Sequence, residues 1–278
     1  MKKTLALVLV LVLAMAALTG CGQTSGSDSA AADNGDMVTI KVGATPTPHA
    51  EILNALKDTL AEQGVDLEVV EYTDYVIPNT AVESGELDAN YFQHLPYLED
   101  FNAENDTHLV SVLPVHYEPM GIFPGKSSDL ESIADGATIA VPNDTTNEAR
   151  ALQLLAAQGL ITLPADAGLD ITPKDITENP HNIQFLEVEA AAVARSLEDA
   201  DFGIINGNYA LEAGLTAEDG LAFEAADSLA AQTYANILVV KEGSENNEAI
   251  QKLKEALTSD ECRQFIEETY NGMVQPVF

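Results

Sequence analysis

The stretch TIAVPNDTTNEARALQLLAAQG, residues 138–159, predicts one complete structural unit. Residues 138–141 are apolar or β-branched and indicate a strand. Residues 147–158 carry apolar side chains at helical spacing, and Gly159 stands where that helix should end. The turn between strand and helix is short and polar. A strand that leads through such a turn into an amphipathic helix is the repeating unit of an α/β protein.

The same alternation continues outward on both sides of this unit. The strands that we predict span 39–44, 67–72, 87–92, 109–114, 183–187, 202–206 and 235–240. Helices are predicted between these strands and at the end of the chain. The first helix should begin at Thr47-Pro48 and end at Gly64, and the last should be capped by Ser259. The pattern therefore predicts an α/β protein with two lobes on mostly parallel sheets. We expect residues 38–118 plus 236–278 to form lobe 1 and residues 119–235 to form lobe 2.

The first residues have the features of an export signal. Lys2 and Lys3 precede an apolar run, which ends at Leu18-Thr19-Gly20-Cys21. This arrangement resembles a bacterial lipobox, so we expect residues 1–20 to be a signal peptide and Cys21 to be acylated. An ordinary signal peptide or a membrane anchor with a chance cysteine is the alternative. The Ser-, Gly- and Asp-rich residues 21–37 predict a flexible tether, so the protein should be lipid-anchored at the extracytoplasmic face of the cell membrane.

The charge of the chain excludes some partners. The formal net charge is −33, and −35 without residues 1–20, which hold two lysines and no acid. Such a surface repels phosphate backbones, so we expect no nucleic-acid partner. It also disfavours electrostatic docking on anionic lipid, which leaves the acyl anchor as the membrane contact. With Cys21 acylated, Cys262 would have no cysteine partner for an internal disulfide.

Sequence signatures of catalysis are absent from the chain. It has no H-E-x-x-H, G-x-S-x-G, Walker or G-x-G-x-x-G motif. Its five histidines show no metal-ligand spacing. We therefore predict that the protein is not an enzyme and that it holds no metal and no cofactor. An extracytoplasmic enzyme and an adhesin without a small ligand remain alternatives from other classes.

Polar side chains at predicted strand ends indicate a binding site. Ligands of open α/β sheets lie beyond the carboxyl ends of the strands. Asn143 lies in the turn after one strand, and Arg150 follows in the next helix. The planar guanidinium of Arg150 suits a carboxylate, although a surface ion pair would explain it equally well. Asn206 ends one strand and Asn236 begins another, where an asparagine can either cap the backbone or hold a ligand.

Aromatic residues gather in one region of the first half. Tyr91, Phe92 and His94 lie close to Tyr97, and Tyr72 and Tyr75 precede them, in a chain that is only 6% aromatic. Core packing explains some of these side chains. The others predict an apolar pocket wall, against which a thioether would pack well.

Several of these segments together closely resemble the MetQ/NlpA family of methionine-binding lipoproteins. The segments that carry the resemblance are KVGATP at 41–46, PHAEIL at 48–53, DANYFQH at 88–94, PND at 142–144, Thr146-Asn147 and INGNYA at 205–210. The resemblance runs from about Thr39 to the C-terminus. It implies a two-lobed periplasmic-binding-protein fold of type II-like architecture, with a hinge and a ligand cleft between the lobes.

The resemblance also implies a function and residue roles. The protein would bind L-methionine and deliver it to the membrane permease of an ABC importer, and we expect it to act as a monomer. Tyr75, Phe92 and His94 would line the side-chain pocket, with Tyr72, Tyr91 and Tyr97 as weaker candidates. The other implied roles are carboxylate binding by Arg150 and contact with the amino-acid backbone by Asn206, Asn236 and the supporting Asn143.

Two positions depart from the family pattern. Thr47 stands where the family usually has glycine, and Thr145 where it usually has proline. Some relatives bind other ligands, so a methionine-containing dipeptide or another apolar amino acid is the alternative ligand.

Overall fold

The computed structural model describes residues 37–225 and 232–278. The predicted signal peptide, Cys21 and nearly all of the predicted tether lie outside the described residues. Residues 35–278 form one compact unit. Within the described ranges, no helix has both the length and the apolar character that a membrane crossing requires.

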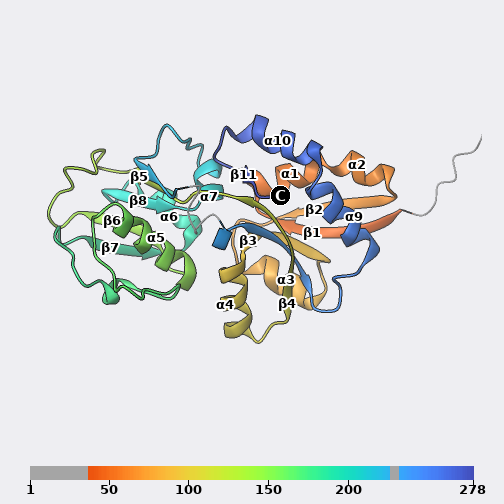
Figure 1. The fold of residues 1–278 in the computed structure, drawn as a ribbon, viewed down its shortest axis with the longest axis horizontal. Coiled ribbons are helices and arrows are strands. Elements are labelled where there is room, and N and C mark those ends of the chain that lie inside the picture. The colour runs from red at the N-terminus through yellow and green to blue at the C-terminus, as the bar shows by residue number, and fades with distance from the viewer. Residues whose placement is uncertain (1–36, 226–231) are drawn as a thin grey trace, which may run out of the picture. The chain divides into compact units, whose positions relative to one another are not determined.

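The first sheet has six strands in the order β11-β4-β10-β3-β1-β2 (Figure 1). Its strands are β1 (Val38–Ala44), β2 (Val65–Glu71), β3 (Ala89–His94), β4 (Leu109–Tyr117), β10 (Asn236–Lys241) and β11 (Gln275–Pro276). Strand β1 pairs in parallel with β2 and β3, whereas β10 runs antiparallel between β3 and β4. Strand β10, from late in the chain, is therefore inserted between two strands from its first half.

Helices cover both faces of this sheet (Figure 1). One face carries the turn η1 (Pro46–Ala50) and helices α1 (Glu51–Ala55), α2 (Lys57–Glu62), α9 (Glu248–Leu257) and α10 (Asp260–Tyr270). The other face carries α3 (Ile77–Ser84) and α4 (Leu95–Asn105). The side chains of β10 alternate accordingly, because Leu238 and Val240 join the first core and Ile237 and Val239 join the second.

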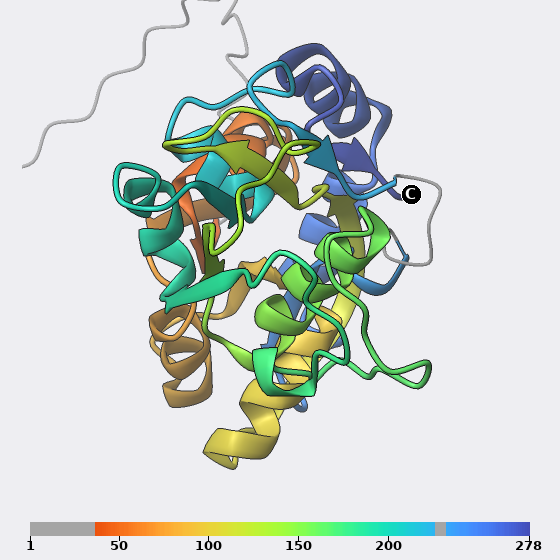
Figure 2. The ribbon, with the colours of Figure 1, turned by 90° about the vertical axis from the view of Figure 1, so that its left-hand side faces the viewer.

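The second sheet has five strands in the order β7-β6-β8-β5-β9, and its end of the ribbon faces the viewer in Figure 2. Its strands are β5 (Gly121–Pro124), β6 (Thr138–Pro142), β7 (Gln184–Val188), β8 (Phe202–Ile205) and β9 (Ala222–Phe223). Helix α5 (Thr145–Ala157) packs on one face, and α6 (Ala190–Ser196) and α7 (Gly207–Glu212) pack on the other. A 3-10 turn, η2 (Pro173–Asp175), lies in the loop between α5 and β7.

Local sequence signals placed most element ends correctly. Gly64, Gly85 and Gly159 follow their helices with φ of 78°, 80° and 74°, the left-handed region that favours glycine. The Ser259 hydroxyl accepts a hydrogen bond from the Cys262 N–H at 3.1 Å, as expected of a cap. Thr47 is extended and its hydroxyl donates to Glu51 Oε2 at 3.1 Å, so it does not cap a backbone N–H.

Both sheets are mixed: most strands of each sheet run in one direction, as predicted, but each sheet also holds antiparallel strands, and three strands were missed. β10 and β11 run antiparallel in the first sheet, and β5 runs antiparallel to β8 and β9 in the second. The missed strands β5, β9 and β11 are short, with four, two and two residues. Segments of this length carry too few alternating side chains to give a signal.

The chain passes between the two sheets twice. The first connection runs from the end of β4 through Glu118 to β5, and the second runs from β9 to β10 and includes the undescribed residues 226–231. The lobe boundaries predicted from the sequence fall in these two connections and stay a prediction.

Candidate functional site

A small cavity lies where the end of β3 meets the first turns of α5 and α7. Both sheets contribute to its lining through the ends of their strands and the connection at Glu118. The lining residues are Tyr75, Phe92, Gln93, His94, Tyr97, Glu118, Asn147, Arg150, Asn206, Gly207, Asn208 and Asn236. This is the place where open α/β sheets bind small ligands.

A chain of amide groups forms one polar side of the cavity. Asn147 Oδ1 accepts hydrogen bonds from Asn206 Nδ2 at 2.8 Å and from His94 Nε2 at 3.1 Å. These bonds turn the other end of the Asn206 amide, Oδ1, away from Asn147. Within the described residues this oxygen has no hydrogen-bond partner, although Asn206 is only 5% exposed. A buried acceptor without a partner costs about 1–3 kcal/mol, so it marks a place suited to a ligand donor.

Asn208 supplies the complementary group two residues later. Its Oδ1 accepts a hydrogen bond from the Tyr75 hydroxyl at 2.6 Å, whereas its Nδ2 has no partner within the described part of the chain. The turn into α7 thus presents one unfilled acceptor and one unfilled donor from neighbouring side chains. An amino-acid ligand carries both complements, an ammonium group and a carboxylate.

Arg150 lines the cavity and also forms a buried ion pair. Its Nε and Nη2 donate to Glu224 Oε1 and Oε2 at 2.8 and 2.6 Å, and Nη2 also donates to the Glu118 carbonyl at 2.9 Å. Burial alone would lower the pKa of Arg150, but the Glu224 charge outweighs it and the pKa is raised. Burial raises the pKa of Glu224, yet the Arg150 charge and hydrogen bonds bring it below its ordinary value. Both groups therefore stay charged at neutral pH.

The sequence left two roles open for Arg150, a ligand contact and a surface ion pair. The ion pair exists, but it is buried rather than on the surface, with Arg150 only 3% exposed. The two-point geometry that suits a ligand carboxylate is used for Glu224. Within the described residues, Nη1 is the guanidinium nitrogen that stays available for another group in the cavity.

Aromatic rings form the apolar wall. The Tyr75 ring lies 5.5 Å from Phe92, 5.7 Å from Tyr97 and 4.9 Å from Tyr209, measured between centroids. Burial raises the pKa of Tyr75 well above its ordinary value, so its hydroxyl keeps the proton that it donates to Asn208. Such a wall favours an apolar, polarizable side chain.

His94 connects the wall to the polar side. Its Nδ1 accepts from the Tyr97 N–H at 3.2 Å, which leaves Nε2 as the donor to Asn147. Burial, with the nearby positive charge of Arg150, lowers the pKa of His94 to about 3. His94 is therefore a neutral wall residue that orients Asn147.

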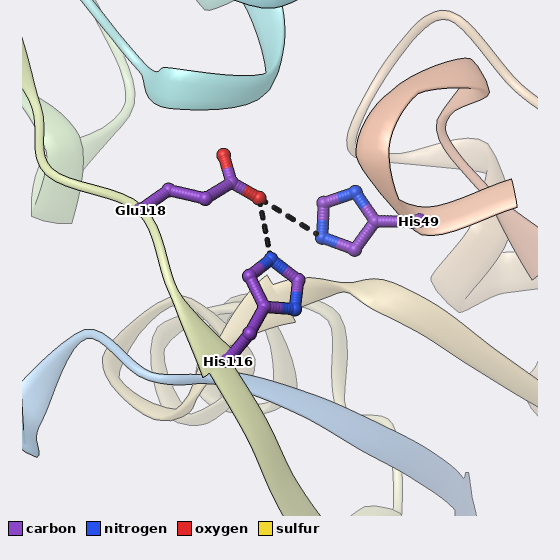
Figure 3. Close-up of side chains that lie close together, drawn as sticks. All are labelled: His49, His116 and Glu118. Atoms are coloured by element: carbon purple, nitrogen blue, oxygen red, sulfur yellow. Dashed lines mark hydrogen bonds and ion pairs between the residues drawn. The ribbon is translucent and has the colours of Figure 1, made fainter. Parts of the chain in front are cut away.

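Asn236 and Glu118 complete the lining beside two histidines that do not line it. Asn236 Oδ1 lies 3.0 Å from His49 Nε2. The Glu118 carboxylate lies close to both His116 and His49 (Figure 3). Burial raises the pKa of Glu118, while His49 and Arg150 act in the opposite direction.

The structure brings six of the seven predicted ligand-binding residues to one cavity: Tyr75, Phe92, His94, Arg150, Asn206 and Asn236. Asn143 lies elsewhere, in the lining of a neighbouring cavity that shares Tyr75 and Tyr97 with the first. Among the weaker candidates, Tyr97 joins the site, Tyr91 lies in the core against His116, and Tyr72 packs beside Leu87 in another core. The binding roles of these residues stay predictions.

Sequence reasoning missed five polar residues of the cavity region: Gln93, Glu118, Asn147, Asn208 and Glu224. Asn147 and Asn208 lie within the segments already singled out, so the turns Asn143–Asn147 and Asn206–Asn208 could have indicated them. Glu118 and Glu224 had no such signal, because they are two of 45 acidic residues. Glu224 meets Arg150 from 74 positions away, a contact that only the folded chain creates.

Comparison with known proteins finds a family match along most of the chain. Residues 40–278 match the family model of the NlpA lipoprotein. The methionine-binding lipoprotein MetQ of Bacillus subtilis is 39% identical over 100% of this chain and 99% of its own length. A lipoprotein structure from Ruminococcus gnavus is 57% identical with a TM-score of 0.85, covering 86% of this chain and 99% of that one.

A third relative was solved with a ligand. The nutrient-binding protein of Burkholderia cenocepacia, whose structure is bound to methionine, is 38% identical with a TM-score of 0.81. The match covers 86% of this chain and 100% of that one. The matched length, the two-sheet fold and these relatives agree, and the chain belongs to the NlpA lipoprotein family.

Proposed function

We propose that this protein is the lipid-anchored substrate-binding component of an ABC importer, that it binds L-methionine in the cavity between β3, α5 and α7, and that it delivers the amino acid to the membrane permease. The methionine-bound relative and the MetQ relative support the ligand class. The observation that carries the proposal is the pair of buried, unfilled groups, Asn206 Oδ1 and Asn208 Nδ2, beside an aromatic wall.

Each part of the amino acid has a complement in the cavity. The carboxylate would accept hydrogen bonds from Arg150 Nη1 and Asn208 Nδ2. The ammonium group would donate to Asn206 Oδ1 and lie near the Glu118 carboxylate, which lines the same cavity. The thioether side chain would pack against Tyr75 and Phe92. Because the ligand is a zwitterion, it would add no net charge to the buried site.

The lining also supports capture rather than turnover. Among the described lining residues there is no serine, cysteine or lysine that could act as a nucleophile. His94, which could serve as a base, has its pKa lowered to about 3 by burial, and both of its ring nitrogens are in hydrogen bonds. Binding and release are the functions that this arrangement favours.

Closure of two lobes would complete the site. We propose that residues 38–118 plus 236–278 and residues 119–235 move as lobes about the two connections. The hydrogen bonds Tyr75–Asn208 and His94–Asn147 join residues of the two parts across the cavity. Opening would break these bonds and expose the ligand groups, whereas closure would exclude water from them.

A ligand panel tests this proposal by thermal stabilisation. Residues 35–278 are unfolded, dialysed and refolded to remove bound ligand, then heated with L-methionine, D-methionine, a methionine-containing dipeptide, L-leucine, L-methioninamide or N-acetyl-L-methionine. We expect L-methionine to raise the melting temperature by about 5–10 °C at a hundredfold excess over Kd. The amide and the N-acetyl compound should do little, because each removes one charged end. A larger shift with the dipeptide or with leucine would overturn methionine as the ligand.

A further inference from the structure

Two histidines and one glutamate lie close together (Figure 3), buried beside the cavity that Glu118 lines. His49, from η1, and His116, from β4, are both 0% exposed, and Glu118 is 4% exposed. Glu118 Oε1 lies 2.7 Å from His116 Nε2 and 3.4 Å from His49 Nε2. Glu118 lines the cavity, whereas neither histidine does. The two imidazoles therefore contact Glu118, a residue of the cavity lining, without lining the cavity themselves.

The hydrogen-bond partners of His116 fix its tautomer. Its Nε2 faces a carboxylate oxygen, so this nitrogen carries the proton and donates it to Glu118. Its Nδ1 is then an acceptor and takes a hydrogen bond from the Tyr91 hydroxyl. Burial raises the pKa of Tyr91 well above its ordinary value, which keeps that hydroxyl a donor. Glu118 is thereby held by a neutral imidazole of defined orientation.

His49 is fixed in the same way and acts on a second lining residue. Its Nε2 faces two acceptors, Asn236 Oδ1 at 3.0 Å and Glu118 Oε1 at 3.4 Å, so it carries the proton. Its Nδ1 lies 2.6 Å from Thr45 Oγ1 and accepts the hydroxyl proton. The Asn236 oxygen is thus turned toward His49. The NH2 end of Asn236 is left as the group that it can offer to the cavity.

A metal ion is the other use that such a cluster could have. The three candidate ligand atoms of His49, His116 and Glu118 lie within 4.8 Å of one another. However, both Nε2 atoms carry protons that the surrounding acceptors hold, and each ring has a second partner on Nδ1. A metal would have to displace both protons and separate Asn236 from His49. The geometry favours a closed hydrogen-bond network.

We propose that His49 and His116 are positioning residues of the binding site: without contacting the ligand, their Nε2–H groups hold the Asn236 amide and the Glu118 carboxylate in the orientations that the ligand requires. This inference rests on the proposed function, because it takes the cavity to be the ligand site. It assigns an indirect role in ligand affinity to two buried side chains that do not line the cavity.

A matched pair of variants tests the role of His49. His49→Gln places an N–H close to the position of Nε2, whereas His49→Asn places its amide close to Nδ1 and leaves Asn236 without a donor. In calorimetric titrations with L-methionine, we expect His49→Gln to bind within about threefold of the native protein and His49→Asn to bind at least about tenfold more weakly. Equal losses in the two variants would show that His49 only fills space, and would overturn the proposal.

The pair His116→Gln and His116→Asn repeats the test at Glu118, with the same expectation and the same contradicting result. The His116 pair replaces the His49 test if either His49 variant fails to fold. Zinc chloride added to the native protein, without methionine, is a further control. Thermal stabilisation by zinc that the two His49 variants lose would show a metal site and overturn the network.

A ligand-free measurement separates this inference from the proposed function. If native protein gives no heat with L-methionine, the proposed function fails. Nitrogen-15 NMR at pH 7 still decides the positioning claim. We expect Nε2–H resonances for His49 and His116, and an Asn236 side-chain amide signal that moves in His49→Asn and stays in His49→Gln. Nδ1–H tautomers, or an Asn236 signal that stays in both variants, would contradict it.

Discussion

Arg150 on α5 is joined to Glu224, beyond β9, by two hydrogen bonds of 2.8 and 2.6 Å. The guanidinium carbon also lies 4.3 Å from the centroid of the Tyr234 ring. The two side chains are only 4% and 8% exposed, and the pair spans 74 positions of the chain. It therefore has two consequences, one for stability and one for the charge that the cavity presents to a ligand.

Removing Arg150 alone should damage the fold as well as binding. Arg150→Met would leave Glu224 buried without its partner, and breaking a buried pair in this way costs about 3–5 kcal/mol. The double variant Arg150→Met/Glu224→Gln removes both charges and should recover most of that free energy of unfolding. It should still bind L-methionine at least about tenfold more weakly, because the carboxylate has lost a charged donor. Urea denaturation and calorimetric titration measure the two effects separately, and native-like affinity in the double variant would exclude Arg150 from the site.

Tyr75→Phe should weaken the link between the two parts of the site. The change removes the 2.6 Å hydrogen bond to Asn208 Oδ1 and leaves that buried acceptor unfilled. We expect the affinity for L-methionine to fall about three- to tenfold. Tyr209→Phe is the matched control, since its hydroxyl is 3.4 Å from the Thr73 carbonyl and contributes a weaker bond. Similar losses in both variants would mean that the Tyr75–Asn208 bond has no special role.

Buried neutral histidines should make the protein sensitive to acid. Burial lowers the pKa of His49 to about 4, and of His94 and His116 to about 3. The unfolded chain, with histidine pKa values near 6.5, binds more protons below that pH. Stability is thus complete above about pH 6.5 and falls as the pH drops toward 4, by roughly 1–2 kcal/mol per histidine at pH 5.

Urea denaturation between pH 7.5 and 5 measures this loss. His49→Gln should reduce the pH dependence of stability by the contribution of one histidine, with His108→Gln, at an exposed position, as the control substitution. A pH dependence equal in His49→Gln and the native protein would contradict a neutral buried His49.

Glu148 should make stability depend on pH in the opposite sense from the buried histidines. Burial, then the charges of Glu187 and Asp144, raise its pKa to about 7, and its Oε1 has no partner within the described residues. Between about pH 4.5 and 7 the folded state holds the extra proton, so its contribution to stability is lost as the pH rises. Glu148→Gln should therefore raise the melting temperature at pH 8 by about 2–4 °C and change it little at pH 4.5. The exposed Glu104→Gln is the control, and equal shifts at both pH values would refute the assignment.

Local signals predicted the units of this fold, because a strand, turn and helix such as β6 and α5 depend on neighbouring residues. The place of β10 could not be predicted in the same way. Its pairing sets Asn236 opposite both His94 and His116, and only tertiary structure fixes that register. The antiparallel direction of β10 could not be predicted for the same reason.

The candidate site likewise combines residues that local sequence indicated with residues that only tertiary structure brings together. Residue type and position indicated Asn206 at a strand end, Arg150 in the following helix of another unit, and Tyr75 and Phe92 in an aromatic group. Their binding roles were implied by the family resemblance, and the cavity collects all four residues. Glu118 and Glu224 could be assigned to the site only from the folded structure, because their roles depend on contacts with His116 and Arg150. Sequence reasoning thus found groups that could face a ligand and missed the groups that hold them in place.

Calorimetric titration of ligand-stripped residues 35–278 with L-methionine tests the central claim most directly. We predict one-to-one binding with a Kd of micromolar order or tighter, a free energy of about −8 kcal/mol or more favourable. The Arg150→Met/Glu224→Gln variant should show a large loss of affinity under the same conditions. Absence of heat, together with no thermal stabilisation by L-methionine, would contradict methionine as the ligand of this cavity.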